Sequence, residues 1–310
     1  MMNVLFDHDA HVDDLLVLMM LQCAEGVRLL GTTVCPGDCF KEPGMLATRR
    51  FLDFFGSKTV AVAGGDDAGL NPFPDLWRAD SEILANLKEL GAAQGDSAAP
   101  SPSAVEFLSA RLQEAPAAVS LLVTGPPPHL AAVLSKQPGL AAKIGRVWIM
   151  GGAVRVGGNV SSPGHDGTAE WNFFNHPKAA DVLVRSGVPI TLVSLDATNK
   201  APVTREFLER LRSQAERYPV SKLALATWKV ALRHIENEDY TQRYYFWDTL
   251  TAAAMIKPGM LKTEAMKIKV ITEGPSQGRT VEDSSGNTVD VGVDVDREQL
   301  ERLILELFRR

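Results

Sequence analysis

The segment from Phe6 to Leu16, "FDHDAHVDDLL", carries four carboxylates within eight residues, Asp7, Asp9, Asp13 and Asp14. An apolar run, "NVLF", leads into it, and a longer one, "LLVLMML", follows it. This pattern predicts a buried strand, a short acidic loop and a buried helix. Acids at the start of a helix commonly cap its free N–H groups, which explains one or two of the four. The others need a second explanation.

A bound cation supplies that explanation. Carboxylates held close together repel one another, and at least one of their pKa values must rise if nothing neutralises them. The available ligands are oxygens, without cysteine or paired histidine, which favours Ca²⁺ or Mg²⁺ over zinc. We expect His8 and His11 to make ordinary hydrogen bonds. Haloacid-dehalogenase-type phosphatases also begin with two aspartates one residue apart. Their motif has Thr or Val where this chain has His11, so the chain fits that motif poorly.

Outside the acidic loop, short apolar strands alternate with helical patterns. The expected strands are "NVLF", "VRLLGTTV", "VSLLVTG", "RVWIMGG", "ITLVSL" and "KIKVI", and expected helices include those at Leu15, 43–55, 130–136, 179–184 and 249–256. This alternation predicts one α/β domain over residues 1–310, with a mostly parallel (mixed) central sheet and helices on both faces. Ligands of such sheets gather beyond the carboxyl ends of the strands. The stretch 91–103 is rich in Ala, Gly, Ser and Pro, and we expect it to be a surface loop.

Composition excludes several classes of function. Hydrophobic residues make up 45% of the 310 residues and charged residues 23%, which is ordinary for a globular enzyme. The net charge is −6, without a run of five basic residues, so neither nucleic acid nor an anionic membrane is an expected partner. The N-terminus has no signal-peptide pattern, and we expect a cytoplasmic protein. The odd number of cysteines, three, predicts reduced, mostly buried thiols.

Further motifs connect the chain to a known family. In order along the chain these are "NPFPDLWR" (71–78), "LVTGP" (122–126), "IMGGAV" (149–154), "DGTAEWNFFNHP" (166–177) and "YYFWDTLTAA" (244–253). Together with the acidic loop, they resemble the nucleoside hydrolases from end to end. The "NPFPDLWR" segment and the Trp before Asp248 are similar to the inosine–adenosine–guanosine-preferring branch.

The resemblance implies a nucleoside hydrolase fold with a Rossmann-like core and a Ca²⁺ at the bottom of a deep pocket. It implies hydrolysis of the N-glycosidic bond of purine ribonucleosides to ribose and free base, with Asp9 as the base that activates a water held at the metal. The implied metal ligands are Asp9, Asp14, the Thr124 carbonyl and Asp248. A homodimer or homotetramer is also implied.

The resemblance assigns substrate contacts as well. The implied ribose contacts are Asp13, Asn159, Glu170, Asn172 and Asp248, with His11 at a position that faces the ribose. The expected base contacts are Asp38, Phe73, Trp77 and Trp247, with the base between the two Trp rings. Supporting positions fall to Asp7, Met150 and Trp171.

The chain departs from the family pattern at several positions. Ala10 and His11 replace Gly and an Asn or Gly, and Pro127, Pro128 and His129 replace Leu, Ser or Thr, and Asn. The segment around 236–247 is the chain's own, and His234 and Arg243 are both candidates for the acid that assists the leaving base. Three alternatives stay open: a pyrimidine or broad-specificity hydrolase, a non-catalytic nucleoside- or ribose-binding protein, and a metal-dependent phosphatase.

Overall fold

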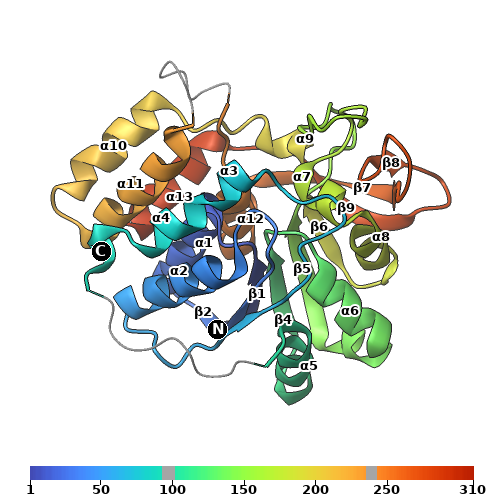
Figure 1. The fold of residues 1–310 in the computed structure, drawn as a ribbon, viewed down its shortest axis with the longest axis horizontal. Coiled ribbons are helices and arrows are strands. Elements are labelled where there is room, and N and C mark those ends of the chain that lie inside the picture. The colour runs from blue at the N-terminus through green and yellow to red at the C-terminus, as the bar shows by residue number, and fades with distance from the viewer. Residues whose placement is uncertain (93–101, 235–242) are drawn as a thin grey trace.

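The computed structural model of the chain describes residues 1–92, 102–234 and 243–310. Within these ranges, nine strands form one sheet in the order β3-β2-β1-β4-β5-β6-β9-β7-β8 (Figure 1). The strands are β1 (Met2–His8), β2 (Val27–Val34), β3 (Val62–Gly64), β4 (Val119–Val123), β5 (Ile144–Met150), β6 (Ile190–Val193), β7 (Leu261–Val270), β8 (Thr280–Glu282) and β9 (Asn287–Val295).

The prediction of a mostly parallel, mixed sheet is confirmed. The pairs from β3 through β6 to β9 are parallel, whereas β7 is antiparallel to both β8 and β9. The "KIKVI" strand therefore runs opposite to the parallel direction that simple alternation suggests. It does so because no helix intervenes between β7, β8 and β9, and strands joined without a crossover pair antiparallel. None of the strands expected from the sequence corresponds to β3, β8 or β9.

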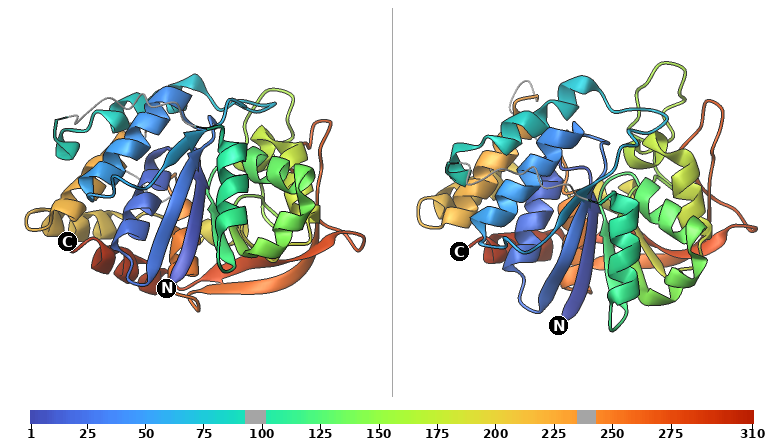
Figure 2. Two further views of the ribbon diagram at one scale, coloured as in Figure 1. Left: turned by 90° about the horizontal axis from the view of Figure 1, so that it is seen from below. Right: turned by 60° about the horizontal axis from the view of Figure 1, so that its bottom comes forward.

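Helices cover both faces of the sheet, as predicted (Figures 1 and 2). The layer on one face consists of α1 (Val12–Cys23), α2 (Lys41–Phe54), α4 (Asp80–Ala85), α10 (Arg205–Ala215), α11 (Pro219–Leu232), α12 (Asp248–Ile256) and α13 (Arg297–Leu307), which share one hydrophobic cluster. The other packs against α5 (Ala104–Glu114), α6 (Pro128–Lys136), η2 (Pro138–Lys143) and α8 (Pro177–Arg185). The short helices α3 (Asp75–Arg78), α7 (Trp171–Asn175), α9 (Leu195–Thr198) and η1 (Lys88–Leu90) complete the chain.

The alternation of side chains along β1 divides the core in two. Val4 and Phe6 pack on the α1 face, and Leu5, between them, packs on the α5 face. This is the period of two expected when a strand is buried on both sides, which is why "NVLF" is apolar throughout. At β1 the sheet is therefore covered on both faces.

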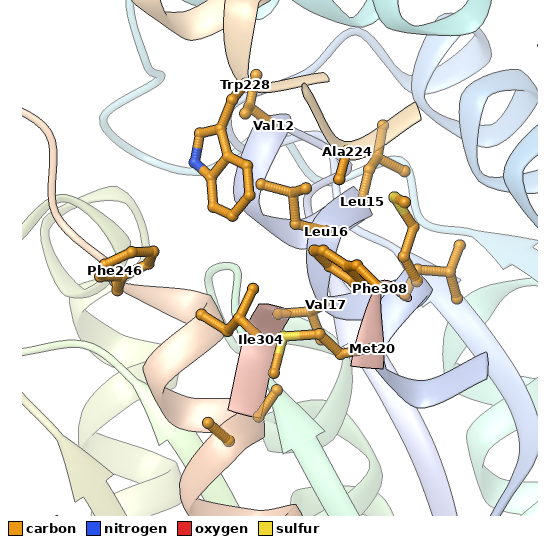
Figure 3. Packing of buried hydrophobic residues seen from close by; sticks show 14 of the residues in the cluster. Val12, Leu15, Leu16, Val17, Met20, Ala224, Trp228, Phe246, Ile304 and Phe308 are labelled. Carbon is orange, nitrogen blue, oxygen red and sulfur yellow. The ribbon is translucent and has the colours of Figure 1, made fainter. Parts of the chain in front are cut away.

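Helix α1 lies at the centre of the larger core cluster. Every residue of the helix is buried except Gln22, which explains why its sequence is apolar on all sides. Figure 3 shows its Leu15, Leu16 and Met20 among Trp228 of α11 and Phe308 beyond α13. Burial of each such side chain contributes about 1.5–3 kcal/mol, and the helix start is thereby fixed relative to the sheet.

Two predicted features fall wholly or partly outside the described residues. Most of the surface loop expected at 91–103 does so, although Ser103 is visible as the N-cap of α5, where its Oγ accepts a hydrogen bond from the amide of Glu106. The segment around 236–247 is described only from Arg243 onward. The cysteine prediction is confirmed, because Cys23, Cys35 and Cys39 are free and buried.

Candidate active site

A cavity of about 380 Å³ opens beyond the carboxyl ends of the parallel strands. Asp9 follows β1, Thr124 follows β4 and Met150 ends β5, so the parallel register brings these positions to one edge of the sheet. The predicted residues that line it are Asp9, His11, Asp13, Asp14, Asp38, Phe73, Trp77, Thr124, Met150, Asn159, Glu170, Trp171, Asn172, Trp247 and Asp248. Of the predicted site residues, only Asp7 is not among its lining.

Four buried carboxylates, Asp9, Asp13, Asp14 and Asp248, form what we call the acid cluster. Oxygen atoms of Asp13, Asp14 and Asp248 lie within 4.8 Å of one another, although α12 begins 235 residues after Asp13. The Oγ1 of Thr124 donates to Oδ1 of Asp14 at 2.5 Å, and the amide of His11 donates to Oδ2 of the same side chain at 3.0 Å. Asp14 therefore caps α1 and also belongs to the acid cluster.

Asp9 is held by backbone on two sides. The amide of Asp38 donates to its Oδ2 at 2.9 Å. A Cβ on Gly125 would come within 2.9 Å of the Asp9 amide nitrogen, so only glycine allows the β4 loop to approach this closely. Ala10, next in the chain, has φ +54°, a left-handed conformation that strains any residue with a Cβ. The geometry of Asp9 is thus imposed by packing around a strained turn.

The acid cluster confines like charges that a bound cation would neutralise. Burial, followed by the charges of Asp13, Asp14 and Asp9, raises the pKa of Asp248 well above its usual range. Burial and the charge of Asp14 do the same to the pKa of Asp9, and they raise the pKa of Asp13 to about 6. Clustered buried carboxylates of this kind fit a hard divalent cation with oxygen ligands. Asp13, which was predicted as a ribose contact, offers an oxygen to this group together with Asp14 and Asp248.

Asp7 lies behind the acid cluster. It contacts His129, one of the residues that differ from the family pattern. Nδ1 of His129, in the first turn of α6, lies 2.8 Å from Oδ1 of Asp7, and Thr33 Oγ1 donates to the same oxygen at 2.7 Å. All three side chains are buried. The contact joins β1, β2 and α6 just below the loop that carries Asp9.

We therefore expect His129→Ala to destabilise the protein by about 2–3 kcal/mol, because it removes one partner of a buried carboxylate. His129→Asn, which retains a side-chain donor, should lose clearly less. Urea unfolding followed by circular dichroism measures both variants. Equal losses in the two variants would show that the hydrogen bond to Asp7 is not what His129 contributes.

The residues predicted to contact ribose also form hydrogen bonds with one another and with the surrounding backbone. Oε1 of Glu170 accepts from the amide of Asn172 at 2.9 Å, and Oε2 accepts from the amides of Gly152 and Phe173. Glu170 thus caps α7 in addition to lining the cavity. Nδ2 of Asn172 donates to the carbonyl of Thr124 at 2.9 Å, the carbonyl predicted as a metal ligand. The Asn159 Oδ1 accepts from the amide of Trp171 at 3.1 Å.

Aromatic side chains form two separate groups in the cavity. Phe73 and Trp171 stack with ring centroids 5.1 Å apart, and Trp77 meets the edge of Trp171 at 5.4 Å. Trp247 lies in another group, packed on Met150 and edge-on to Tyr244 at 4.9 Å. Trp77 and Trp247 therefore both line the cavity, from different parts of the wall. Buried Nε1 of Trp247 and Oη of Tyr244 have no hydrogen-bond partner among the described residues.

His11 lies between two carboxylates. Its Nδ1 lies 3.6 Å from Asp38 and its Nε2 lies 3.5 Å from Asp80. Burial opposes protonation, but the charge of Asp38 and the contact with Asp80 outweigh it and raise the pKa of His11 to about 9. The His11 side chain therefore brings positive charge to the cavity wall beside the acid cluster.

Sequence reasoning missed two residues of the site, Tyr244 and Asp80. Tyr244 was quoted within "YYFWDTLTAA" without a role, although its place four residues before Asp248 in a motif was a usable signal. Asp80 had no such signal, because it follows the "NPFPDLWR" segment as an ordinary first-turn acid of α4. Both candidates for the leaving-group acid, His234 and Arg243, line the cavity.

Comparison of the fold with solved structures defines the class of protein. The structure of an inosine-uridine preferring nucleoside hydrolase from Bacillus anthracis matches with a TM-score of 0.91 and 36% identity, over 100% of this chain and 99% of that one. A purine-preferring ribonucleoside hydrolase from Gardnerella vaginalis matches with a TM-score of 0.82 and 25% identity, over 99% of each chain. The fold is thus that of the nucleoside hydrolases.

The sequence places the chain within that class. The profile of the family described as inosine-uridine preferring nucleoside hydrolase matches residues 4–302, and the chain belongs to this family. A pyrimidine-specific ribonucleoside hydrolase, RihA, from Citrobacter koseri is 30% identical over 98% of this chain and 96% of its own length. The family resemblance drawn from the motifs is confirmed. Relatives of both base preferences occur, so membership alone does not select purines.

Proposed function

We propose that this chain hydrolyses the N-ribosidic bond of purine ribonucleosides with the help of Ca²⁺. The observation that supports this most directly is one cavity that combines the acid cluster with the polar groups of Asn159 and Asn172 and two sets of aromatic rings. Carboxylates suit a cation and sugar hydroxyls, and aromatic faces suit a nucleobase. A nucleoside presents these two halves in one molecule.

The chain's own residues have distinct roles in the proposed reaction. Departure of the base leaves a ribosyl group with oxocarbenium-ion character, and water attacks C1′ from the opposite face. We propose that Asp9 accepts the proton of that water. Asp13 and Asn172 hold the 2′- and 3′-hydroxyls, whereas Asn159 and the remaining acceptor capacity of Glu170 meet the 5′-hydroxyl. Asp38 has a buried Oδ1 without a partner among the described residues, which makes it available to the base.

The proposed ligands of the cation are Asp9, Asp14, Asp248 and the Thr124 carbonyl, with Asp13 close by. When bound, Ca²⁺ would supply the positive charge that keeps Asp9 ionised and would orient water and sugar hydroxyls. Four protein oxygen ligands in one site favour Ca²⁺ over the smaller Mg²⁺, which usually keeps several waters and uses only one or two carboxylates. Isothermal titration of chelator-treated protein with each ion tests this preference.

Substrate assays decide the activity. Purified protein is incubated with inosine, adenosine, guanosine, uridine and cytidine, and released reducing sugar is measured. We expect release from the purine nucleosides first. Absence of release from all five, with binding retained in calorimetry, would support the non-catalytic binding protein instead, and release of phosphate from phosphomonoesters would support the phosphatase.

A pyrimidine-preferring hydrolase is the second candidate, because the Citrobacter koseri relative is named pyrimidine-specific. The same panel separates the two, since the candidates predict opposite orders of kcat/KM for inosine and uridine. The two aromatic groups of the cavity are the reason we place purines first. A bicyclic base offers more area for stacking than a pyrimidine does.

Trp247→Ala tests the stacking directly. We expect it to weaken transition-state binding of purine nucleosides by about 1–3 kcal/mol and of uridine by clearly less, because base–aromatic stacking is lost. Trp247→Phe is the matched control, since it keeps an aromatic face and the packing on Met150. Steady-state kcat/KM for inosine and uridine gives the comparison. Equal losses for both substrates would remove the argument for purine preference.

Three further expectations carry over as proposals: a single domain over residues 1–310, a homodimer or homotetramer, and action on free nucleosides in the cytoplasm. In the part of the chain that the structure describes, none of the helices is both long and apolar enough to cross a membrane. Size-exclusion chromatography with light scattering measures the assembly.

A further inference from the structure

Asp80 is a fully buried carboxylate that the proposed reaction does not yet use. It lies at the start of α4, beside the cavity. Both of its oxygens lie at hydrogen-bond distance from Nε2 of His234, at 3.0 and 2.9 Å. The guanidinium of Arg233 donates to Oδ1, and Nε2 of His11 lies 3.5 Å from Oδ2. A buried charge with this many partners is held in one position.

His234 is the partner of Asp80 that also reaches the nucleoside site. It follows the end of α11 and lines the cavity together with Trp77, Tyr244 and Trp247. Nε2 faces both oxygens of Asp80 and also lies 3.4 Å from Nε of Arg233. Because a carboxylate can only accept, Nε2 carries a hydrogen in the arrangement we propose, and Nδ1 is the nitrogen left to meet a ligand. Among residues 1–92, 102–234 and 243–310, Nδ1 of His234 has no hydrogen-bond partner. A carboxylate on one ring nitrogen fixes the orientation of the imidazole.

The other candidate for the leaving-group acid is chemically unsuited to the role. Arg243 lines the same cavity, but a guanidinium does not give up its proton under ordinary conditions. It can attract the electron density of the base but cannot protonate it. His11, the remaining cavity histidine, lies between Asp38 and Asp80 at 3.6 and 3.5 Å, and its Nε2 has no hydrogen-bond partner among the described residues. Of these two histidines, His234 is the one whose ring is held at hydrogen-bond distance by a carboxylate, with its second nitrogen unpartnered within the described part of the chain.

We propose that His234 donates a proton to the departing base and that Asp80 is the positioning residue that holds the imidazole for this step. The inference rests on the proposed function. The C1′–N bond breaks with both electrons passing to the base nitrogen system, which takes the proton from Nδ1 of His234. The water oxygen bonds to C1′, and the proton of the water passes to Asp9. Solvent then restores the proton of His234 and accepts that of Asp9, so nucleoside and water give ribose and base.

A substrate that needs no proton on its leaving group separates this role from a structural one. p-Nitrophenyl β-D-ribofuranoside releases an anion that is stable near neutral pH. We expect His234→Gln and Asp80→Asn to lower kcat on the best ribonucleoside about 10²-fold and to change kcat on the nitrophenyl riboside less than about threefold. Asp53→Asn, which removes a carboxylate from the distant Arg49 pair on α2, is the matched control and should change neither rate.

A double variant provides the second measurement, using natural nucleosides alone. If Asp80 acts only through His234, the variant with both substitutions is no slower than His234→Gln. Losses that multiply, or equal losses on both classes of substrate, would overturn the assignment. Wild-type protein that cleaves none of the ribonucleosides would instead refute the proposed function. Thermal melts of each variant show whether a loss comes from misfolding.

Discussion

The Asp9→Asn variant is expected to lose at least ~10³ in kcat, because one side chain has two tasks in the proposed reaction. An amide cannot accept the proton of the attacking water, and it is a weaker ligand for a hard cation. The substitution preserves shape, so the hydrogen bond from the Asp38 amide to Oδ2, or to the oxygen that replaces it, can persist. Steady-state release of ribose from inosine measures the effect.

Two measurements separate the tasks of Asp9. Calorimetric titration with Ca²⁺ reports the ligand role, and kcat at saturating Ca²⁺ reports the base role. Asp75→Asn is a suitable control, because this exposed carboxylate on α3 pairs with Arg78 and is not among the residues that line the cavity. A loss below about tenfold in Asp9→Asn at saturating Ca²⁺ would identify some other group as the base.

Removal of divalent cations should abolish activity and make stability depend strongly on pH. Without a cation, burial and mutual repulsion raise the pKa values of Asp9 and Asp248 well above normal and that of Asp13 to about 6. Burial also raises the pKa of Glu170 to about 7. Each of these groups binds its proton more tightly in the folded than in the unfolded chain. Their contribution to stability is therefore complete below pH ~4 and is lost as pH rises through the folded-state values.

The expected result is a melting temperature of chelator-treated protein that falls between pH 5 and pH 8. Saturating Ca²⁺ should replace the protons and flatten this dependence, so the stabilisation by Ca²⁺ is largest at the alkaline end. Differential scanning fluorimetry at several pH values, with and without Ca²⁺, tests it. A melting temperature that is insensitive to Ca²⁺ at pH 8 would contradict a cation site in the acid cluster.

Much of the fold could be predicted because it follows from patterns of apolar residues over short stretches of the sequence. The apolar runs that became β1, β2, β4, β5 and β6 are each followed by a helical pattern, and burial on both faces leaves no alternation to misread. The strand β9 was not predicted, although "VDVGVDV" has Val at every second position. It belongs to the antiparallel end of the sheet, which a pattern of alternating strands and helices does not describe. A crossover pattern reports parallel pairs and carries no information about hairpins.

The candidate site divides in the same way. The acidic loop was recognisable because its four carboxylates are close in sequence, and the family motifs supplied the distant members. The pairing of His129 with Asp7 spans 122 positions, and that of His234 with Asp80 spans 154. Neither pair has a shared motif or a helical period that could have suggested it. Only the three-dimensional structure reveals these two pairs.

The sequence by itself therefore determined the class of fold, the concentration of negative charge after the first strand and the membership of a hydrolase family. It could do so because hydrophobic periodicity and acid spacing act over a few residues. Only the tertiary structure decided which carboxylate neighbours which. It placed Asp13 beside Asp248, put His11 between Asp38 and Asp80, and gave Glu170 to the cap of α7. Electrostatic energy depends on distance in space, and the sheet edge brings together charges that the chain keeps far apart.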